Sequence, residues 1–163
     1  MATLINIKER IMTMIAIACD HAGIDLKPAV LTVLDELDIP YIDFGTNSHE
    51  SVDYPIYGVK AAHAVASGQC DMGIIFCGTG VGIGIAASKV KGIRCVTCSD
   101  TYTAKMSRLH NNANMLSLGS RVLGRELAKD IVRTWLLTTF EGERHARRVN
   151  LLDALDRGED ILC

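Results

Sequence analysis

The chain has 163 residues, of which 48% are hydrophobic and 22% are charged. This composition is typical of one globular domain and excludes a disordered or fibrous chain. A chain of this length buries about 70% of the surface that its unfolded form exposes, so its core needs no disulfide or metal ion. The net charge of −2 lacks the positive excess expected of a protein that binds nucleic acid or anionic membranes, and we therefore expect a small-molecule partner.

The cysteine pattern indicates a reducing compartment. Six cysteines lie at positions 19, 70, 77, 95, 98 and 163, mostly inside apolar runs. In a chain with enough apolar residues for a core, this pattern favours free thiols in the cytoplasm over three disulfides. Cys95 and Cys98 form a C-x-x-C pair, but they lack a second pair or histidines at zinc-like spacing. We expect both to be buried in a strand, with no metal ion bound.

The N-terminal segment has two interpretations. Two basic residues precede an apolar run over 11–18 that ends in Cys19, which resembles a short lipoprotein export signal. The run is short for such a signal, and cleavage at its end would remove the first predicted strand. We therefore interpret residues 1–12 as an extension and residues 13–163 as one domain. No apolar stretch reaches the ~18 residues of a membrane span, so we expect no membrane partner.

Short apolar runs alternate with longer segments of helical periodicity, in the order typical of parallel strands joined by helices. The runs are almost continuously apolar, as expected of strands covered on both faces. We predict strands over 14–19, 41–44, 72–77, 93–98 and 114–118. The predicted fold class is α/β, a Rossmann-like three-layer sandwich in which a five-stranded parallel sheet has helices on both faces.

The segments between these strands predict the covering helices. Apolar residues recur every three or four positions from Leu26 to Leu37, which makes one helical stripe. Pro55 suits the first turn of the next helix, and Gly68 suits its end. The next helix is expected to begin inside the glycine-rich segment, with Gly78 and Gly80 in the turn and Gly82 in the helix. Further helices are expected over 101–111, over 122–138 and near 151–156.

The segment after the third predicted strand reads Cys77-Gly78-Thr79-Gly80-Val81-Gly82 and leads from a buried strand into a helix. Backbone N–H groups at such a junction converge on one point, and the helix dipole also favours an anion there. A thiolate is stabilised by the same groups, so Cys77 is either a packing residue or a catalytic base or nucleophile. The Walker spacing is absent, and the match of 82–87 to a dinucleotide fingerprint starts too far beyond the strand.

Other polar residues also follow the predicted strands. Ligands of open parallel sheets bind beyond the carboxyl ends of the strands, so Asp20 and His21 lie where a ligand is expected. His110 precedes the fifth strand and is a second candidate for polar contacts. Arg144 and Arg148 are four residues apart, so one helix face would present both, and Arg121 would add a third phosphate donor. A solvated basic surface is the alternative for these arginines.

Taken together, the motifs resemble the ribose-5-phosphate isomerase B branch of the family that also contains galactose-6-phosphate isomerase. They match in order and spacing over about residues 14–158. The residues that carry the resemblance are Asp20-His21-Ala22-Gly23, Asp53-Tyr54-Pro55, Cys77 to Ile83, Gly92-Ile93-Arg94, His110-Asn111, Asn114 and Gly119-Ser120-Arg121.

The resemblance implies an aldose–ketose isomerase that interconverts ribose 5-phosphate and ribulose 5-phosphate without a metal ion or cofactor. It implies that Cys77 is the base that moves a proton between C2 and C1, and that His110 assists ring opening. The groups expected to hold the enediolate oxygen are Thr79 and the amides of Gly78, Gly80, Val81 and Gly82. The remaining contacts to sugar and phosphate are expected from Asp20, His21, Asn111, Arg121, Arg144 and Arg148.

The resemblance also implies a homodimer or a dimer of dimers, in which each active site takes its His110 segment from the partner subunit. Three alternatives stay open. Galactose 6-phosphate is disfavoured as a substrate because His110 and Asn111 are both retained. Allose 6-phosphate differs by one hydroxymethyl unit and is harder to exclude. A non-catalytic sugar-phosphate sensor is disfavoured by the intact Cys77.

Overall fold

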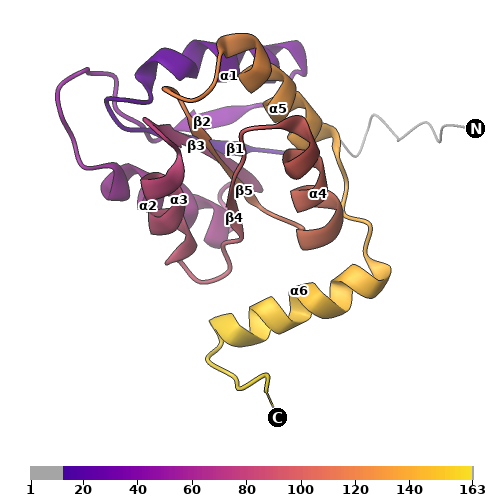
Figure 1. The fold of residues 1–163 in the computed structure, drawn as a ribbon. Coiled ribbons are helices and arrows are strands. Elements are labelled where there is room, and N and C mark those ends of the chain that lie inside the picture. Colours follow the sequence, from indigo (N-terminus) through magenta and orange to yellow (C-terminus); the bar gives the residue numbers. More distant parts are fainter. Residues whose placement is uncertain (1–12, 163) are drawn as a thin grey trace, which may run out of the picture.

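The computed structural model describes residues 13–162, in which five parallel strands form one sheet with helices on both faces (Figure 1). The predicted α/β fold class is therefore confirmed, and the predicted extension 1–12 lies outside the described residues. The strands are β1 (Ile15–Cys19), β2 (Tyr41–Asp43), β3 (Met72–Cys77), β4 (Cys95–Thr97) and β5 (Met115–Gly119). Their order is β2-β1-β3-β5-β4, so the chain changes direction across the sheet between β1 and β3. Ligands of open α/β sheets bind at such a switch point.

The helices follow the strands in the predicted alternation. They are η2 (Ile24–Leu26), α1 (Lys27–Glu36), α2 (Tyr54–Ala66), α3 (Val81–Ser88), α4 (Thr101–Asn111), α5 (Arg125–Leu137) and α6 (Glu143–Asp156). Gly68 adopts a positive φ of 79° directly after the cap of α2, which confirms its predicted role at the end of that helix. None of the described helices is long and apolar enough to cross a bilayer.

Two hydrophobic cores lie on the two faces of the sheet. The first contains Ile15, Ile17 and Cys19 of β1 together with apolar side chains of α1, α4 and α5. The second contains Ala16 and Ala18 of the same strand together with side chains of α2 and α3. This alternation follows from the two-residue period of a strand, and every β1 residue is buried because both faces are covered. The central strands therefore form a rigid support for the loops that follow them.

The edge strands differ from the prediction. β4 is limited to Cys95–Thr97 rather than 93–98, and Cys95 is half-buried rather than buried. β2 is also shorter than predicted and leaves Tyr41 and Asp43 exposed. The expectation that all five strands are covered on both sides is wrong for these two. Each pairs with one neighbour only, so solvent reaches its other edge.

The C-terminal helix also departs from the prediction. A helix was expected near 151–156, but α6 begins at Glu143 and includes the whole Arg-rich segment. Gly142 and Glu143 both have positive φ, which turns the chain sharply, and no glycine or proline follows until Gly158. α6 extends away from the sheet (Figure 1), with Asp153 paired to Arg94 at 2.8 Å. The helix predicted over 122–138 is observed as α5 over a shorter range, because Gly124 has an extended backbone and forms the N-cap.

Candidate active site

The loop between β3 and α3 presents the Cys77 sulfur to a backbone amide. Cys77 is the last residue of β3 and is 5% exposed. The N–H of Gly80 donates a hydrogen bond to its Sγ atom at 3.2 Å. This contact needs a left-handed backbone, because Gly80 has φ +79° and serves as the N-cap of α3. The dinucleotide-like segment Gly82–Ala87 lies inside α3, as the spacing predicted.

Hydroxyl groups of strands β4 and β5 hydrogen-bond to the same loop. Ser117 of β5 and Thr97 of β4 both donate hydrogen bonds to the carbonyl oxygen of Gly80. These two bonds fix the Gly80 carbonyl toward the sheet at the first turn of α3. Thr79 is exposed, and its Oγ1 accepts a hydrogen bond from the N–H of Val81 at 3.3 Å. The loop can therefore offer several preorganised donors to an anion.

The loops after β1 and β5 lie against this segment. The N–H groups of Ser120 and Arg121 donate to the carbonyls of Cys77 and Gly78 at 2.9 and 3.0 Å. The Arg121 side chain lies over Gly78, since its Cδ is 3.5 Å from the position that a Cβ of Gly78 would take. Ser120 also donates to the carbonyl oxygen of Ala22, which joins the loops after β5 and β1.

Asp20 and His21 occupy the adjacent loop in different ways. Asp20 is 5% exposed, and its Oδ1 accepts hydrogen bonds from the N–H groups of Ala22 and Gly23, so it stabilises its own turn. His21 accepts the N–H of Val52 on Nδ1 at 3.1 Å, which leaves its Nε2 as the protonated nitrogen of a neutral ring. We call Asp20, His21, Cys77, Arg121 and the segment 78–82 the loop cluster.

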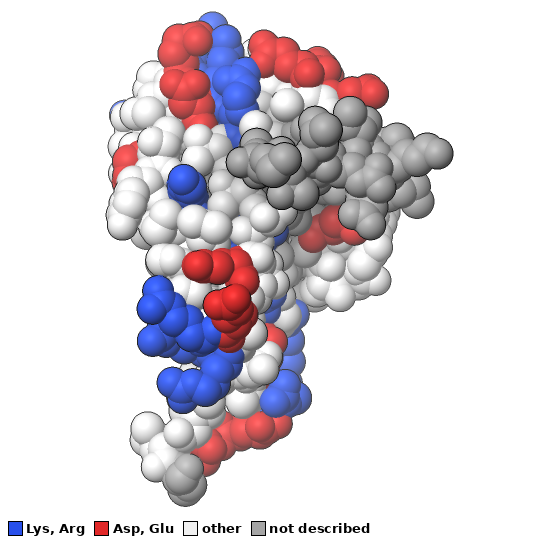
Figure 2. All heavy atoms as spheres, turned by 90° about the vertical axis from the view of Figure 1, so that its right-hand side faces the viewer, with Lys and Arg blue, Asp and Glu red and all other residues white. Residues whose placement is uncertain are grey.

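The other predicted site residues lie together elsewhere. His110 and Asn111 end α4, while Arg144 and Arg148 lie on the first two turns of α6. Basic side chains gather over this protruding part of the molecule (Figure 2), and the three arginines of α6 are exposed. The side chain of His110 is 37% exposed. We call His110, Asn111, Arg144 and Arg148 the helix cluster.

The two clusters lie at opposite ends of the parallel strands. The loop cluster lies at the carboxyl ends, which we call the carboxyl edge, and the helix cluster lies at the amino ends, which we call the amino edge. α4 starts just beyond the carboxyl end of β4, with Asp100 as its N-cap, and ends just before β5 begins. Because the strands are parallel, α4 must run back from the carboxyl edge to the amino edge, and its 11 residues span about 16 Å. Cys77 lies at the carboxyl edge, beside Gly119 in the register. One chain therefore does not bring His110 to Cys77.

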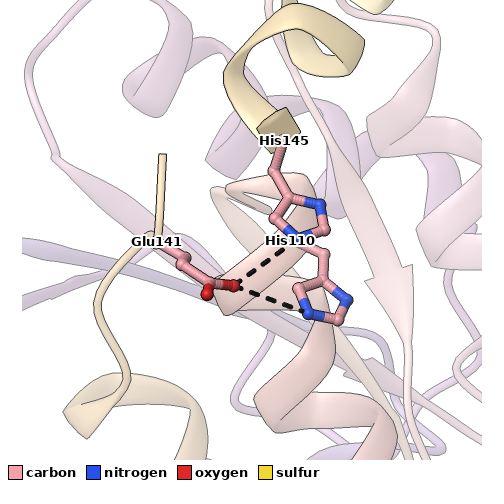
Figure 3. Close-up of side chains that lie close together, drawn as sticks. All are labelled: His110, Glu141 and His145. Carbon is pink, nitrogen blue, oxygen red and sulfur yellow. Dashed lines mark ion pairs between the residues drawn. The ribbon is translucent and has the colours of Figure 1, made fainter. Parts of the chain in front are cut away.

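Sequence reasoning did not single out two residues of the amino edge, Glu141 and His145. The His145 ring stacks on the His110 ring, with centroids 4.1 Å apart and an angle of 11° between the planes. Glu141 points at both rings (Figure 3), with Oε2 at 3.8 Å from His110 Nε2 and 3.5 Å from His145 Nε2. The four-residue spacing of Glu141 and His145 was the available signal, but only the fold adds His110.

Burial raises the thiol pKa of four of the five other cysteines. It raises the pKa of Cys19 to about 11 and the pKa of Cys95 to about 12, because a buried thiolate loses its hydration. Burial also raises the pKa of Cys70 and of Cys98. Thiols with raised pKa values form little thiolate near neutral pH, so these four are poor bases.

Comparison with known proteins identifies the family of the chain. The sequence pattern of a family described as Ribose/Galactose Isomerase matches residues 15–152. The chain belongs to this family. It is 51% identical to ribose-5-phosphate isomerase B of Escherichia coli over 146 residues, which cover 90% of this chain and 98% of that protein. The resemblance to the ribose-5-phosphate isomerase B branch is thus confirmed.

Solved structures and one further relative extend the comparison. A structure of ribose-5-phosphate isomerase B from Clostridium thermocellum has a TM-score of 0.87 at 51% identity, covering 90% of this chain and 99% of that one. The enzyme from Mycoplasma genitalium, with bound ribulose 5-phosphate, has a TM-score of 0.85 at 36% identity, covering 90% and 98%. A D-erythrulose-4-phosphate isomerase from Pectobacterium atrosepticum is 40% identical, covering 91% and 98%.

Gly80→Ala should destabilise the protein by about 1–3 kcal/mol, because alanine tolerates a left-handed backbone poorly. Its Cβ would also lie 2.8 Å from the carbonyl carbon of Leu118. The measurement is the free energy of unfolding in urea at fixed protein concentration. Gly124→Ser is the control, since Gly124 is the N-cap of α5 with φ −70°, an added Cβ meets nothing within 4 Å, and serine is as favourable as glycine at an N-cap, so stability should not fall. Equal stability of the two variants would contradict the need for a left-handed backbone at position 80.

Proposed function

We propose that the protein interconverts D-ribose 5-phosphate and D-ribulose 5-phosphate through an enediolate. The observation that carries this proposal is the Cys77 sulfur at the end of a buried strand, with the Gly80 amide directed at it at 3.2 Å. This cysteine stands beside the sheet's switch point, at the start of a helix that favours anions. The 51% identity to an enzyme named ribose-5-phosphate isomerase B supports the choice of substrate.

The proposed chemistry moves one proton between neighbouring carbons. The Cys77 thiolate takes the C2 proton of the open-chain aldose, and the electrons of the C–H bond form the enediolate with negative charge on O1. The loop amides of residues 78–82 and Thr79 stabilise that charge as it develops, and a single such donor is worth about 3 kcal/mol. A proton passes from O2 to O1, and Cys77 returns its proton to C1 as the carbonyl forms at C2.

Ring opening precedes this step in the aldose direction. Ribose 5-phosphate is stored as a furanose, and only the open aldehyde has an acidic C2 proton. We assign His110 to the exchange of protons with the ring oxygen and the anomeric hydroxyl. Asp20, His21 and Asn111 are assigned to the sugar hydroxyls. Arg121, Arg144 and Arg148 are assigned to the phosphate, which guanidinium groups bind through paired hydrogen bonds.

We further propose a homodimer with shared active sites. The separation of the loop cluster from the helix cluster supports it, since His110 can meet a Cys77 only on another subunit. Apolar side chains on the outer faces also support it, because Val81 and Ile85 of α3 are 52% and 57% exposed. A groove of about 430 Å³ between β4 and α6 is lined by Leu152 and Leu155 and offers a complementary apolar surface.

We also propose that the protein works in a reducing compartment, the cytoplasm. The free thiols of the five described cysteines support this location.

The substrate is tested by a coupled assay that compares ribose 5-phosphate with allose 6-phosphate, galactose 6-phosphate and erythrulose 4-phosphate. We expect the highest kcat/KM for ribose 5-phosphate. The four-carbon sugar belongs in the panel because one relative at 40% identity is named for it. Binding of ribose 5-phosphate without any turnover would favour the sensor alternative, and preference for a six-carbon or four-carbon sugar would overturn the proposed substrate.

Cys77→Ser should lower kcat by about 10²–10⁴-fold, because an alcohol of nearly the same shape does not readily become the base. Binding of the sugar phosphate, measured by calorimetry, should stay within several-fold. Cys70→Ser is the matched control, since Cys70 is also buried but lies before β3, away from the loop cluster. It should retain turnover, whereas near-normal turnover by Cys77→Ser would reject Cys77 as the base.

The shared site is tested by refolding Cys77→Ser and His110→Ala chains together. Each variant alone has two damaged sites per dimer, whereas a mixed dimer has one intact and one doubly damaged site. Random pairing makes about half of the dimers mixed, so about a quarter of all sites should be intact. We expect ribose 5-phosphate turnover to recover accordingly.

The matched control for this experiment is a mixture of Cys77→Ser with Arg121→Ala. Both residues belong to the loop cluster of one chain, so every site keeps one lesion and the activity of the mixture should equal the average of the two variants measured separately. Absence of recovery in the first mixture, with subunit exchange confirmed by mass spectrometry, would show that Cys77 and His110 act within one chain.

A further inference from the structure

The stacked rings of His110 and His145 form a preorganised unit at the junction of α4 and α6. His145 is 4% exposed, although it lies near the start of a helix that extends away from the sheet. The N–H of Glu141 donates to the carbonyl oxygen of Leu109 at 3.0 Å, which brings the linking segment beside the end of α4. The stack is therefore held from two sides, by the helix start and by this backbone contact.

A metal ion is one possible occupant of this cluster, because one ligand atom from each of His110, Glu141 and His145 lies within 4.8 Å of the others. The geometry argues against it. An imidazole binds a metal along the lone pair in its ring plane, and two rings stacked at 11° direct such lone pairs side by side rather than at one point. The Arg144 guanidinium also donates to His145 Nε2 at 3.3 Å, where it would repel a cation.

The contact from Arg144 instead indicates the protonation state of His145. A guanidinium N–H is only a donor, so His145 Nε2 must accept, and the ring is neutral with its proton on Nδ1. Burial lowers the pKa of His145, and the neighbouring charges of His110, Arg144 and Arg148 lower it further, while Glu141 opposes them. His145 therefore stays uncharged at neutral pH, and the Glu141 carboxylate is left to pair with His110 Nε2.

We propose that His145 and Glu141 are positioning residues that hold the His110 ring for ring opening. The neutral His145 ring fixes the plane of His110 through the stack at 4.1 Å. The Glu141 carboxylate lies 3.8 Å from Nε2 and favours the orientation of His110 that directs this nitrogen toward it. This inference rests on the proposed function, because it assigns the two residues to the step that precedes proton transfer by Cys77.

Measurements with ribose 5-phosphate and with ribulose 5-phosphate distinguish ring opening from proton transfer. Ribose 5-phosphate must open its furanose ring before Cys77 can act. Ribulose 5-phosphate is an open chain, because the oxygen that would close a five-membered ring on its C2 carbonyl carries the phosphate. Exchange of the C1 hydrogen of ribulose 5-phosphate with heavy water therefore reports the proton transfer of Cys77 without ring opening. A positioning role for His110 predicts different losses in the two measurements.

The experiment measures both readouts for His145→Ala, His145→Phe and Glu141→Gln, with C1 exchange followed by proton NMR. His145→Ala should lower kcat/KM for ribose 5-phosphate by about 10- to 100-fold, as expected of a catalytic group misplaced by about 1 Å. Its exchange rate should stay within about threefold of the unmodified protein. His145→Phe, which can still stack, should recover most of the turnover. Glu141→Gln should show a smaller loss of turnover than His145→Ala, with exchange retained.

Arg147→Ala is the surface control, since Arg147 is exposed on α6 and has no assigned role, and it should change neither readout. Unchanged turnover in both His145→Ala and Glu141→Gln would overturn the positioning role. Equal losses of turnover and exchange in His145→Ala would also overturn it, since they would indicate a structural defect. Failure of the proposed function gives a different result, in which the unmodified protein neither isomerises ribose 5-phosphate nor exchanges the C1 hydrogen.

Discussion

The parallel direction of all five strands is the constraint on which the rest of the structure depends. It places every loop that follows a strand at one edge of the sheet, where the loops after β1, β3 and β5 contact one another. The loops that carry His21, Cys77 and Arg121 meet there, although they are far apart in the sequence. The same constraint sends each connecting helix back to the other edge. His110, at the end of α4, is therefore removed from Cys77 by the geometry that assembles the loop cluster.

The proposed division of the active site between two subunits would give α6 a functional role. Within one chain, α6 buries His145, Val149 and Ala154 but leaves its three arginines exposed. As part of a dimer, it would present Arg144 and Arg148 together with His110 to the loop cluster of the partner. The ion pair between Arg94 and Asp153 fastens the far half of α6 to the chain before β4. The protruding helix and the incomplete loop cluster are thus complementary features of one proposed assembly.

Prediction from sequence succeeded where local chemistry decides the structure. The α/β alternation, the turn after α2 at Gly68 and the start of α3 after Gly80 follow from strand length and the conformational freedom of glycine. It was less accurate where exposure depends on neighbours. β2 and β4 are shorter and more open than predicted because they lie at the edges, and apolar periodicity does not reveal which strands those are. The start of α6 was misplaced because its basic residues lack an apolar stripe.

The sequence by itself determined the family, the loop after β3 and the residue types available for proton transfer, because short motifs encode turns and backbone donors directly. Only the tertiary structure decided that His145 stacks on His110 and that Glu141 faces both rings. These contacts join α4 to residues more than thirty positions later in the chain, and no local pattern specifies where two helices cross. The separation of Cys77 from His110 was decided in the same way, by the direction of α4 across the sheet.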